Sequence, residues 1–290
     1  GGGAGTGSIS PVSPMNSARD EPSVFYDSRS APSRIYVTGG SGTANGEWLD
    51  LGAMAWTASG TLPSSLLSPA VVPYSSIGYF NLGGATVYTG YSEMTTDGTN
   101  WGTNSPITPT ASIGRSGRAD FPAQGKTYLF GGYPTLTNIV GYDWGTGTVS
   151  VLSPTLSAGR ANASTAILSD GNVMIVGGEG VSTPSDACDL LNLTDPMNPT
   201  LSSCGTLVGD IGVFGGVLAP LPNGDAMLIG GATGTGSGTA TPGIQFYNHT
   251  TQSWSAGNPL PEPRAEAASA IPPDGRVILF GGRDSSGNPM

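Results

Sequence analysis

The chain is patterned as short apolar runs, each of which ends in a pair of glycines. Six pairs follow one another along the chain: Gly39-Gly40, Gly83-Gly84, Gly131-Gly132, Gly177-Gly178, Gly230-Gly231 and Gly281-Gly282. Their successive spacings are 44, 48, 46, 53 and 51 residues, a period typical of propellers and solenoids. In four units a turn glycine stands six positions before the pair, as in GKTYLFGG and GNVMIVGG. Asn-Gly or Asp-Gly at this point indicates a tight hairpin, so each unit is predicted to contain two strands joined by that turn.

Two further strands per unit are predicted from the flanking segments. Runs of small residues precede the hairpins, as in RANASTAIL from Arg160 and RAEAASAI from Arg264, and small side chains suit a strand crowded near a central axis. An aromatic or apolar segment follows each hairpin, around Trp56, Trp101, Val149–Leu152, Leu201 and Trp254. No segment has a convincing helical period. The chain is therefore predicted to be all-β, with four strands in each unit.

This unit resembles the repeat of the kelch family, which includes the propeller of galactose-oxidase-like proteins. A kelch unit has an arginine before the inner strand, a glycine pair after the second strand, Tyr-Asp in the third and tryptophan in the fourth. The glycine pairs all match, and arginine occurs at Arg19, Arg115 or Arg118, Arg160 and Arg264. Tyr-Asp is kept only at Tyr142-Asp143, and tryptophan is missing from two of the five complete units.

The resemblance covers nearly the whole chain and implies a six-bladed kelch-type β-propeller with four-stranded antiparallel blades. Residues 8–290 are expected to form a single domain after a flexible, glycine-rich N-terminus at residues 1–7. The last blade is expected to be closed by mixing N- and C-terminal strands, with Ser8–Met15 outermost and Pro263–Gly282 supplying the first two strands. Its third strand is unaccounted for, and an unpaired edge invites another strand. We expect either that the polypeptide continues beyond Met290 or that a neighbouring molecule donates the strand by β-augmentation.

Composition limits the partners of this protein. Ten basic residues stand against twenty acidic ones, which gives a net charge of −10 with no basic cluster, so nucleic acid is excluded as a partner. No apolar run approaches 18 residues, and therefore no membrane span is expected. Nine of the ten basic residues are arginine, and a lysine-poor surface of small and hydroxyl residues fits an extracellular, cell-surface or cell-wall protein.

Two further features agree with an oxidising compartment. Cys188 and Cys204 are 16 residues apart and fall on the predicted third and fourth strands of one blade, where we expect a disulfide; two buried free thiols are the alternative. Asn-x-Ser/Thr triplets begin at Asn162, Asn192 and Asn248. Asn192 and Asn248 lie in predicted outer turns with room for a glycan, whereas Asn162 begins a crowded inner strand.

No cofactor and no metal site are expected. Copper radical oxidases with a kelch-like propeller use two histidines, two tyrosines and a cysteine, and His249 is the only histidine here. One histidine and two widely spaced cysteines match no usual zinc pattern either. Phosphate binding by the glycine pairs would require a following helix, so the glycines are interpreted as structural.

The sparse charges gather just before or inside the predicted inner strands, which converge at one mouth of a propeller channel. The candidate ligand-binding residues are Arg19, Glu21, Arg115, Arg118, Asp120, Arg160, Asp210, Arg264 and Glu266. Trp48, Tyr91 and Tyr133 follow glycine pairs and would border the same face. Either these charges form a polar binding site, or the arginines brace neighbouring blades through backbone carbonyls and acidic residues.

Two functions of different class follow. The preferred one is an extracellular binding or assembly module for proteins or glycans, in a surface layer, cell wall or filament. The alternative is a carbohydrate-active enzyme on the same fold, such as an oxidase relative, an epimerase or a lyase. Fold alone does not decide between them.

Overall fold

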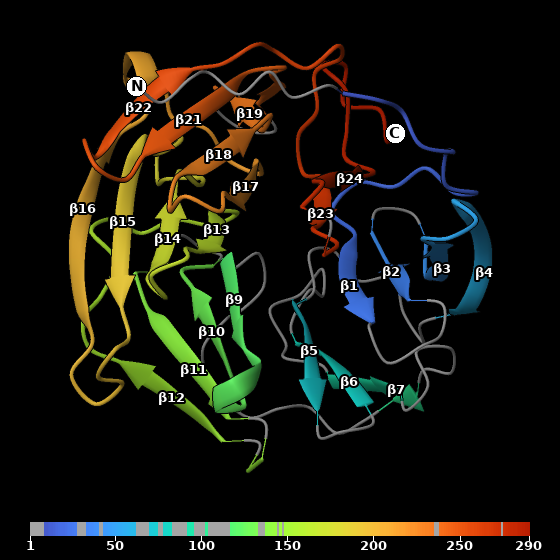
Figure 1. Cartoon of the computed structure of the whole chain (residues 1–290), viewed down its shortest axis with the longest axis horizontal. Coiled ribbons are helices and arrows are strands. Elements are labelled where there is room, and N and C mark those ends of the chain that lie inside the picture. Colours follow the sequence, from blue (N-terminus) through green and yellow to red (C-terminus); the bar gives the residue numbers. More distant parts are fainter. Residues whose placement is uncertain are drawn as a thin grey trace.

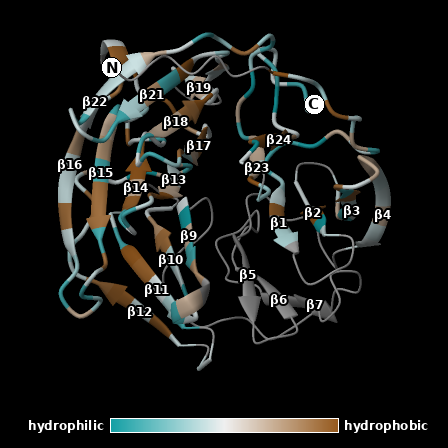
Figure 2. Ribbon diagram, viewed as in Figure 1, coloured by the Kyte–Doolittle hydropathy of each residue, from teal (hydrophilic) through white to brown (hydrophobic). Residues whose placement is uncertain are grey.

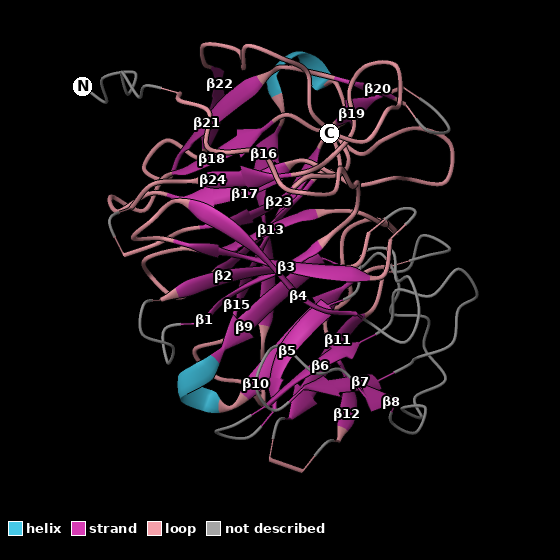
Figure 3. Ribbon diagram, turned by 90° about the vertical axis from the view of Figure 1, so that its right-hand side faces the viewer, coloured by secondary structure: helices cyan, strands magenta, loops and turns pink. Residues whose placement is uncertain are grey.

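The computed structural model describes residues 9–27, 33–40, 43–61, 70–74, 78–82, 92–95, 102–103, 117–132, 137–143, 145–146, 148–234, 238–273 and 275–290. Within these ranges the chain consists of strands and loops with two short 3-10 turns, η1 (Pro122–Gln124) and η2 (Val208–Asp210) (Figure 3). No helix in this part of the chain is long and apolar enough to cross a membrane.

Five antiparallel sheets contain four strands each, and we number them in chain order. Sheet 1 contains β1 (Ser23–Asp27), β2 (Arg34–Thr38), β3 (Asn45–Asp50) and β4 (Ala55–Thr61). Sheet 2 contains β5 (Ala70–Tyr74), β6 (Gly78–Leu82), β7 (Ser92–Thr95) and β8 (Gly102–Thr103). Sheet 3 contains β9 (Gly117–Phe121), β10 (Lys126–Phe130), β11 (Ile139–Asp143) and β12 (Val149–Leu152). Sheet 4 contains β13 (Ser164–Ile167), β14 (Val173–Val176), β15 (Ala187–Asn192) and β16 (Thr200–Thr206). Sheet 5 contains β17 (Val217–Pro220), β18 (Ala226–Ile229), β21 (Ile244–Asn248) and β22 (Ser253–Ala256).

Two smaller sheets complete the described structure. Sheet 6 pairs β23 (Ala268–Ala270) with β24 (Ile278–Phe280). A separate hairpin of β19 (Ala232–Thr233) and β20 (Thr239–Ala240) is inserted between β18 and β21.

The sheets are arranged around a central axis, with the first strand of each sheet innermost (Figure 1). Neighbouring sheets meet through these first strands, since β13 contacts both β9 and β17, and β1 contacts both β5 and β23. In sheets 1, 4, 5 and 6 the first residue of the inner strand pairs with the residue just before the glycine pair, as Ser164 pairs with Val176. The predicted all-β propeller with antiparallel four-stranded sheets is confirmed.

The core lies between the faces of neighbouring sheets. Met174 and Val176 of sheet 4 pack against Leu218 and Leu228 of sheet 5, and Phe280 of sheet 6 packs against Ile35 of sheet 1. Figure 2 shows that strands such as β11 and β15 are largely hydrophobic, whereas many turns are hydrophilic. Apolar burial between sheets is therefore the main stabilising contribution.

Four of the described glycine pairs, those of sheets 3, 4, 5 and 6, join their sheet to the next one. The N–H of the second glycine donates to a carbonyl just before the next inner strand, from Gly178 to Val213 O and from Gly231 to Arg264 O, both at 2.8 Å. The first glycine has φ +63° at Gly177, and a Cβ there would lie 2.0 Å from the Val213 carbonyl oxygen. Only glycine combines this left-handed backbone with so close an approach, so the structural interpretation of the glycine pairs is correct.

The same bond closes the ring between the two ends of the chain. Gly282 N donates to Arg19 O at 2.8 Å, and Arg19 N donates to Met290 O at 3.2 Å. Segments far apart in the sequence thereby join sheet 6 to sheet 1.

Two predictions about the last sheet need correction. The described part of the expected outer strand, residues 9–15, forms no strand, because Pro11 and Pro14 lack the N–H groups that a strand ladder needs. The segment packs instead through Val12 and Met15 against the core between sheets 6 and 1. Sheet 6 thus has two strands in the described residues, and the expected closure of the last blade by mixing N- and C-terminal strands is not found there.

Candidate functional site

Four equivalent residues line the inner end of the sheets. Glu21, Asn162, Gly215 and Glu266 each stand two residues before an inner strand, β1, β13, β17 or β23. Their φ angles are +49°, +50°, +61° and +55°, in the left-handed region that residues other than glycine rarely adopt. We call these four residues the girdle.

Backbone hydrogen bonds connect the girdle around the axis. Gly215 N donates to Asn162 O at 2.8 Å, Glu266 N to Gly215 O at 2.7 Å, and Glu21 N to Glu266 O at 3.0 Å. Each bond crosses from one sheet to its neighbour. The packing of neighbouring sheets thus holds these four residues in the left-handed conformation. Each girdle residue therefore has the same backbone conformation at the same place in its sheet.

The girdle lines a small pocket of about 140 Å³. The lining residues are Glu21, Pro22, Asn162, Ala163, Gly215, Gly216, Glu266 and Ala267. Each contributing sheet supplies a girdle residue and the residue after it. Most of the lining residues are therefore small, and three of them have polar side chains: the acidic Glu21 and Glu266, and Asn162.

The polar side chains of the pocket differ in their partners. The Asn162 amide nitrogen Nδ2 is buried and has no hydrogen-bond partner in the described structure. Glu266 accepts a hydrogen bond from the buried Arg283, with 2.6 Å between Oε2 and Nε. A buried donor without a partner is costly.

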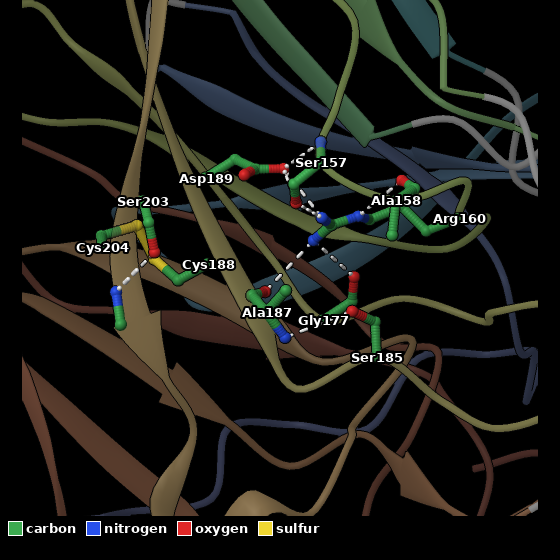
Figure 4. A network of polar contacts seen from close by, with 11 residues as sticks. Ser157, Ala158, Arg160, Gly177, Ser185, Ala187, Cys188, Asp189, Ser203 and Cys204 are labelled. Carbon is green, nitrogen blue, oxygen red and sulfur yellow. Dashed lines mark hydrogen bonds and ion pairs between the residues drawn. A yellow bond between two sulfur atoms is a disulfide. The ribbon is translucent and has the colours of Figure 1, made fainter.

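Arg160 is fully buried, and its guanidinium contacts residues of sheet 4 and of the loop before it (Figure 4). Its Nη2 lies 2.7 Å from Asp189 Oδ2, and its Nη1 donates to the carbonyls of Gly177 and Ala187 at 3.3 and 3.1 Å. Ser157 donates through N and Oγ to the same carboxylate oxygen. Burial lowers the pKa of the Arg160 guanidinium, and the carboxylate of Asp189 opposes that lowering.

Arg19 repeats this arrangement in sheet 1. It is also fully buried, with Nη2 at 2.6 Å from Glu47 Oε1 and Nη1 donating to the carbonyls of Gly39 and Asn45 at 3.1 and 2.6 Å. In sheet 6, Arg264 Nη1 donates to the carbonyl of Gly281. These three arginines thus brace their own sheets at the glycine pair, and they lie outside the pocket lining.

The other predicted charges are spread along the ring. Arg118 and Asp120 on β9 form a pair at 2.8 Å, and their side chains are 26% and 23% exposed. Asp210 ends η2, seven residues before β17. Arg115, Tyr91 and Tyr133 lie outside the described residues. Trp48 stacks under the Arg34 guanidinium, whose carbon lies 3.9 Å from the ring centroid.

The predicted disulfide is present. Cys188 on β15 and Cys204 on β16 are joined, with their Cα atoms 5.0 Å apart and both side chains buried. As expected, they lie on the third and fourth strands of one sheet.

The predicted glycan acceptors lie at the outer ends of strands. Asn192 is exposed at the end of β15, and half-buried Asn248 at the end of β21 accepts hydrogen bonds from the N–H groups of Thr250 and Thr251. His249, in the next turn, is exposed and lies 2.9 Å from Asp225 through Nδ1. In the described residues no group of three or more histidine, cysteine or acidic side chains is arranged to hold a metal ion.

Sequence reasoning missed two residues of this site. Asn162 was considered only as a glycan acceptor, although its place two residues after Arg160 matches Glu21 after Arg19 and Glu266 after Arg264. That common offset was the available signal. Arg283 carried no signal, because its approach to Glu266 depends on the loop after the last glycine pair.

Comparison with known proteins supports the class of fold. The structure is similar to a solved structure titled "Structure of YjhT", with a TM-score of 0.76 and 16% sequence identity over 96% of this chain and 94% of that chain. At this identity the likeness supports a β-propeller fold and nothing finer. No protein-family model and no curated protein matches the chain.

Proposed function

We propose that this chain is a six-bladed, kelch-type β-propeller of the extracellular space. Five four-stranded sheets and the two-stranded sheet 6 surround the axis, and the Gly282–Arg19 bond links the first and last sheets. Repeated arginine contacts to the glycine pair in sheets 1, 4 and 6 support a kelch-type unit. The disulfide favours an oxidising compartment, where Asn192 and Asn248 are the proposed glycan acceptors.

Its function in this proposal is to bind a hydroxyl-rich ligand, such as a glycan or a glycosylated partner protein, at the girdle pocket. The observation that carries this proposal is one pocket whose lining includes the Asn162 side chain and two carboxylates, those of Glu21 and Glu266. An amide donor next to carboxylate acceptors matches the hydroxyl groups of a sugar, each of which both donates and accepts. A pocket of this size holds one terminal sugar residue of a glycan, or a single substituent on a sugar, rather than a long oligosaccharide.

A carbohydrate-active enzyme is the second candidate. Glu21 and Glu266 come from neighbouring sheets and line the same pocket, and two carboxylates are the usual groups for acid–base chemistry on sugars. Turnover of a bound sugar would favour this candidate over the binding module.

The experiment is a glycan array, followed by affinity measurements on the best ligand with wild type and Asn162→Gly. Gly215 already fills the equivalent position in sheet 5 with a similar φ, so glycine is compatible with this backbone. Relief of left-handed strain and the added chain entropy of glycine are each about 1 kcal/mol and nearly cancel. Removing the buried, unpartnered amide also relieves a desolvation cost of about 1–3 kcal/mol, so stability should not fall, while affinity falls about tenfold or more.

Asp170→Asn provides the control, because Asp170 is exposed in the β13–β14 turn and should leave affinity unchanged. Unchanged affinity in Asn162→Gly would refute the proposal that ligand binds at the girdle pocket. A melting curve of the same sample shows whether the variant is folded. Loss of binding by a folded variant is then due to the lost ligand contact and not to unfolding.

A further inference from the structure

In three sheets the residue that follows the glycine pair is held beside the girdle. It forms an antiparallel backbone bridge with the residue that stands just before the girdle residue of the same sheet. These bridges are Ala161–Glu179, Phe214–Ala232 and Ala265–Arg283. In sheet 6, Arg283 N donates to Ala265 O at 2.8 Å and Ala265 N donates to Arg283 O at 3.1 Å. The backbone thus places an arginine next to the girdle residue Glu266.

The Arg283 side chain is buried and joins two parts of the ring. Its Nε donates to Glu266 Oε2 at 2.6 Å, and its Nη1 donates to Gly238 O at 3.4 Å. The side chains of Arg283 and Glu266 are 6% and 10% exposed. Charges so far removed from water are tolerated when they are paired, so the guanidinium and the carboxylate hold each other in place.

The second acceptor of Arg283 belongs to the β19–β20 hairpin of sheet 5. Gly238 has φ +60°, and a Cβ there would lie 2.9 Å from two ring carbons of Phe214. Phe214 is buried in one cluster with Ala232, Ala240 and Ala265. The hairpin is therefore packed against the loops that carry two girdle residues, and it gives Arg283 a fixed carbonyl.

Glu266 is held from its other side by the girdle of sheet 5. Its N–H donates to Gly215 O at 2.7 Å, and a Cβ at Gly215 would lie 2.8 Å from Glu266 Cγ. The Glu266 side chain therefore lies across the place that a side chain of sheet 5 would occupy. It is enclosed between Gly215 and Arg283.

The two oxygens of the Glu266 carboxylate have different surroundings. Oε2 accepts the hydrogen bond from Arg283, whereas Oε1 accepts none within the described part of the chain and is not fully buried. Since Glu266 lines the girdle pocket, Oε1 is the oxygen to which a bound hydroxyl group would donate. An acceptor that is already oriented loses less freedom when a ligand binds.

We propose that Arg283 is a positioning residue of the girdle pocket. Through Oε2 it holds the Glu266 carboxylate across Gly215, and it leaves Oε1 as an oriented acceptor for a ligand hydroxyl. Arg283 is outside the pocket lining, so it acts through Glu266. The inference rests on the proposed function, because it assigns a role in hydroxyl binding at the same pocket.

The test is a double-mutant cycle with Arg283→Met, Glu266→Gln and the variant that carries both changes. The probes are the methyl glycosides of glucose, galactose and mannose, titrated by ligand-observed NMR, because a pocket of this size suits a single sugar. Arg118→Met is the control, since it removes an arginine–carboxylate pair on β9 outside the pocket lining. Asn162→Gly is titrated alongside as a report on the pocket itself.

Affinity and stability should respond differently in this cycle. Arg283→Met should raise the Kd of the best-bound glycoside about tenfold, and Glu266→Gln should raise it by a similar factor. The double variant should bind within about twofold of Glu266→Gln, because both changes remove the same oriented acceptor. The melting temperature should fall in Arg283→Met, which leaves a carboxylate unpaired, and recover in the double variant, which removes both charges. Arg118→Met should bind like wild type.

An ion pair that only joins the hairpin to the loop of sheet 6 gives other results. Wild-type affinity in folded Arg283→Met, the same loss from Arg283→Met in the Glu266→Gln background, or affinity that recovers together with stability would overturn the proposal. Arg283→Lys is the second variant, because lysine keeps the charge but not the position of Nε. Its Kd should rise about threefold, and wild-type affinity would again refute positioning.

The Asn162→Gly titration separates this inference from the proposed function. Weaker binding by Asn162→Gly, with wild-type binding by both Arg283 variants, would overturn positioning and leave the proposed function standing. Wild-type binding by Asn162→Gly and by the Arg283 variants would refute both.

Discussion

Replacing Gly177 by alanine tests the role of the glycine pairs most sharply, because the chain provides a matched control. Gly177 (φ +63°) and the turn residue Gly171 (φ +84°) both have left-handed backbone. A Cβ at Gly177 would lie 2.0 Å from the Val213 carbonyl oxygen, whereas a Cβ at Gly171 meets nothing within 4 Å. The two substitutions thus share the backbone strain and differ only in the clash with the next sheet.

The expected magnitudes follow from these contacts. Gly171→Ala should cost about 1 kcal/mol, the strain of a left-handed alanine. Gly177→Ala adds an overpacking cost of about 1–3 kcal/mol. It also weakens the adjacent Gly178–Val213 hydrogen bond, which contributes about 1 kcal/mol. The total is about 3–5 kcal/mol, a large part of a typical folding free energy.

The assay is equilibrium unfolding in guanidinium chloride, followed by circular dichroism, for wild type and both variants. Gly177→Ala should have a midpoint clearly below that of Gly171→Ala at an unchanged slope. Equal midpoints for the two variants would refute the reasoning that the pair is glycine because the neighbouring sheet approaches it.

Three further predictions concern charge and covalent links. Arg160→Met should destabilise by about 3–5 kcal/mol because it leaves a buried carboxylate unpaired, whereas Arg118→Ala, at a partly exposed pair, should cost less than about 1 kcal/mol in the same unfolding assay. Mass spectrometry without reductant should yield a peptide linking Cys188 to Cys204, and replacing both with alanine should cost about 3 kcal/mol; freely alkylated thiols would contradict the assignment. Side-chain and backbone donors hold the pKa of Asp284 below its ordinary value, so its stabilising contribution is complete above about pH 4 and is lost as pH falls through the lower, folded-state pKa. The Asp284→Asn variant should therefore show a shallower loss of the free energy of unfolding in acid, and an identical acid limb would contradict this.

The repeat made most of the fold predictable. Glycine pairs at a period near 48 residues and Asp-Gly turns such as Asp170-Gly171 specify hairpins locally, and the structure joins them into the predicted four-stranded sheets. The disulfide was predictable because Cys188 and Cys204 were assigned to paired strands.

The ends of the ring were not predictable in the same way. Residues 9–15 were expected to form a strand because they resemble the end of a kelch unit, but their prolines remove ladder donors and the segment packs through its side chains instead. The closure contact between Gly282 and Arg19 depends on the whole ring coming together, and no local pattern encodes it.

The candidate site was predicted in outline only. The positions of the charged residues in the sequence indicated the loops before the inner strands. They did not distinguish the arginines, which bind carbonyls of their own sheets, from the girdle residues, which line the pocket. That separation depends on the left-handed backbone two residues after the arginine, which packing imposes. Asn162, an uncharged residue, could not be found by counting charges at all.

The central claim is that ligand binds at the girdle, and amide hydrogen exchange with and without the best array glycan tests it most directly. Ligand at the girdle should slow exchange at Ala163, Gly215, Gly216, Glu266 and Ala267 and leave it unchanged in outer turns such as Asp195–Asn198. Protection confined to outer turns or to the fourth strands, with the girdle amides unchanged, would contradict it.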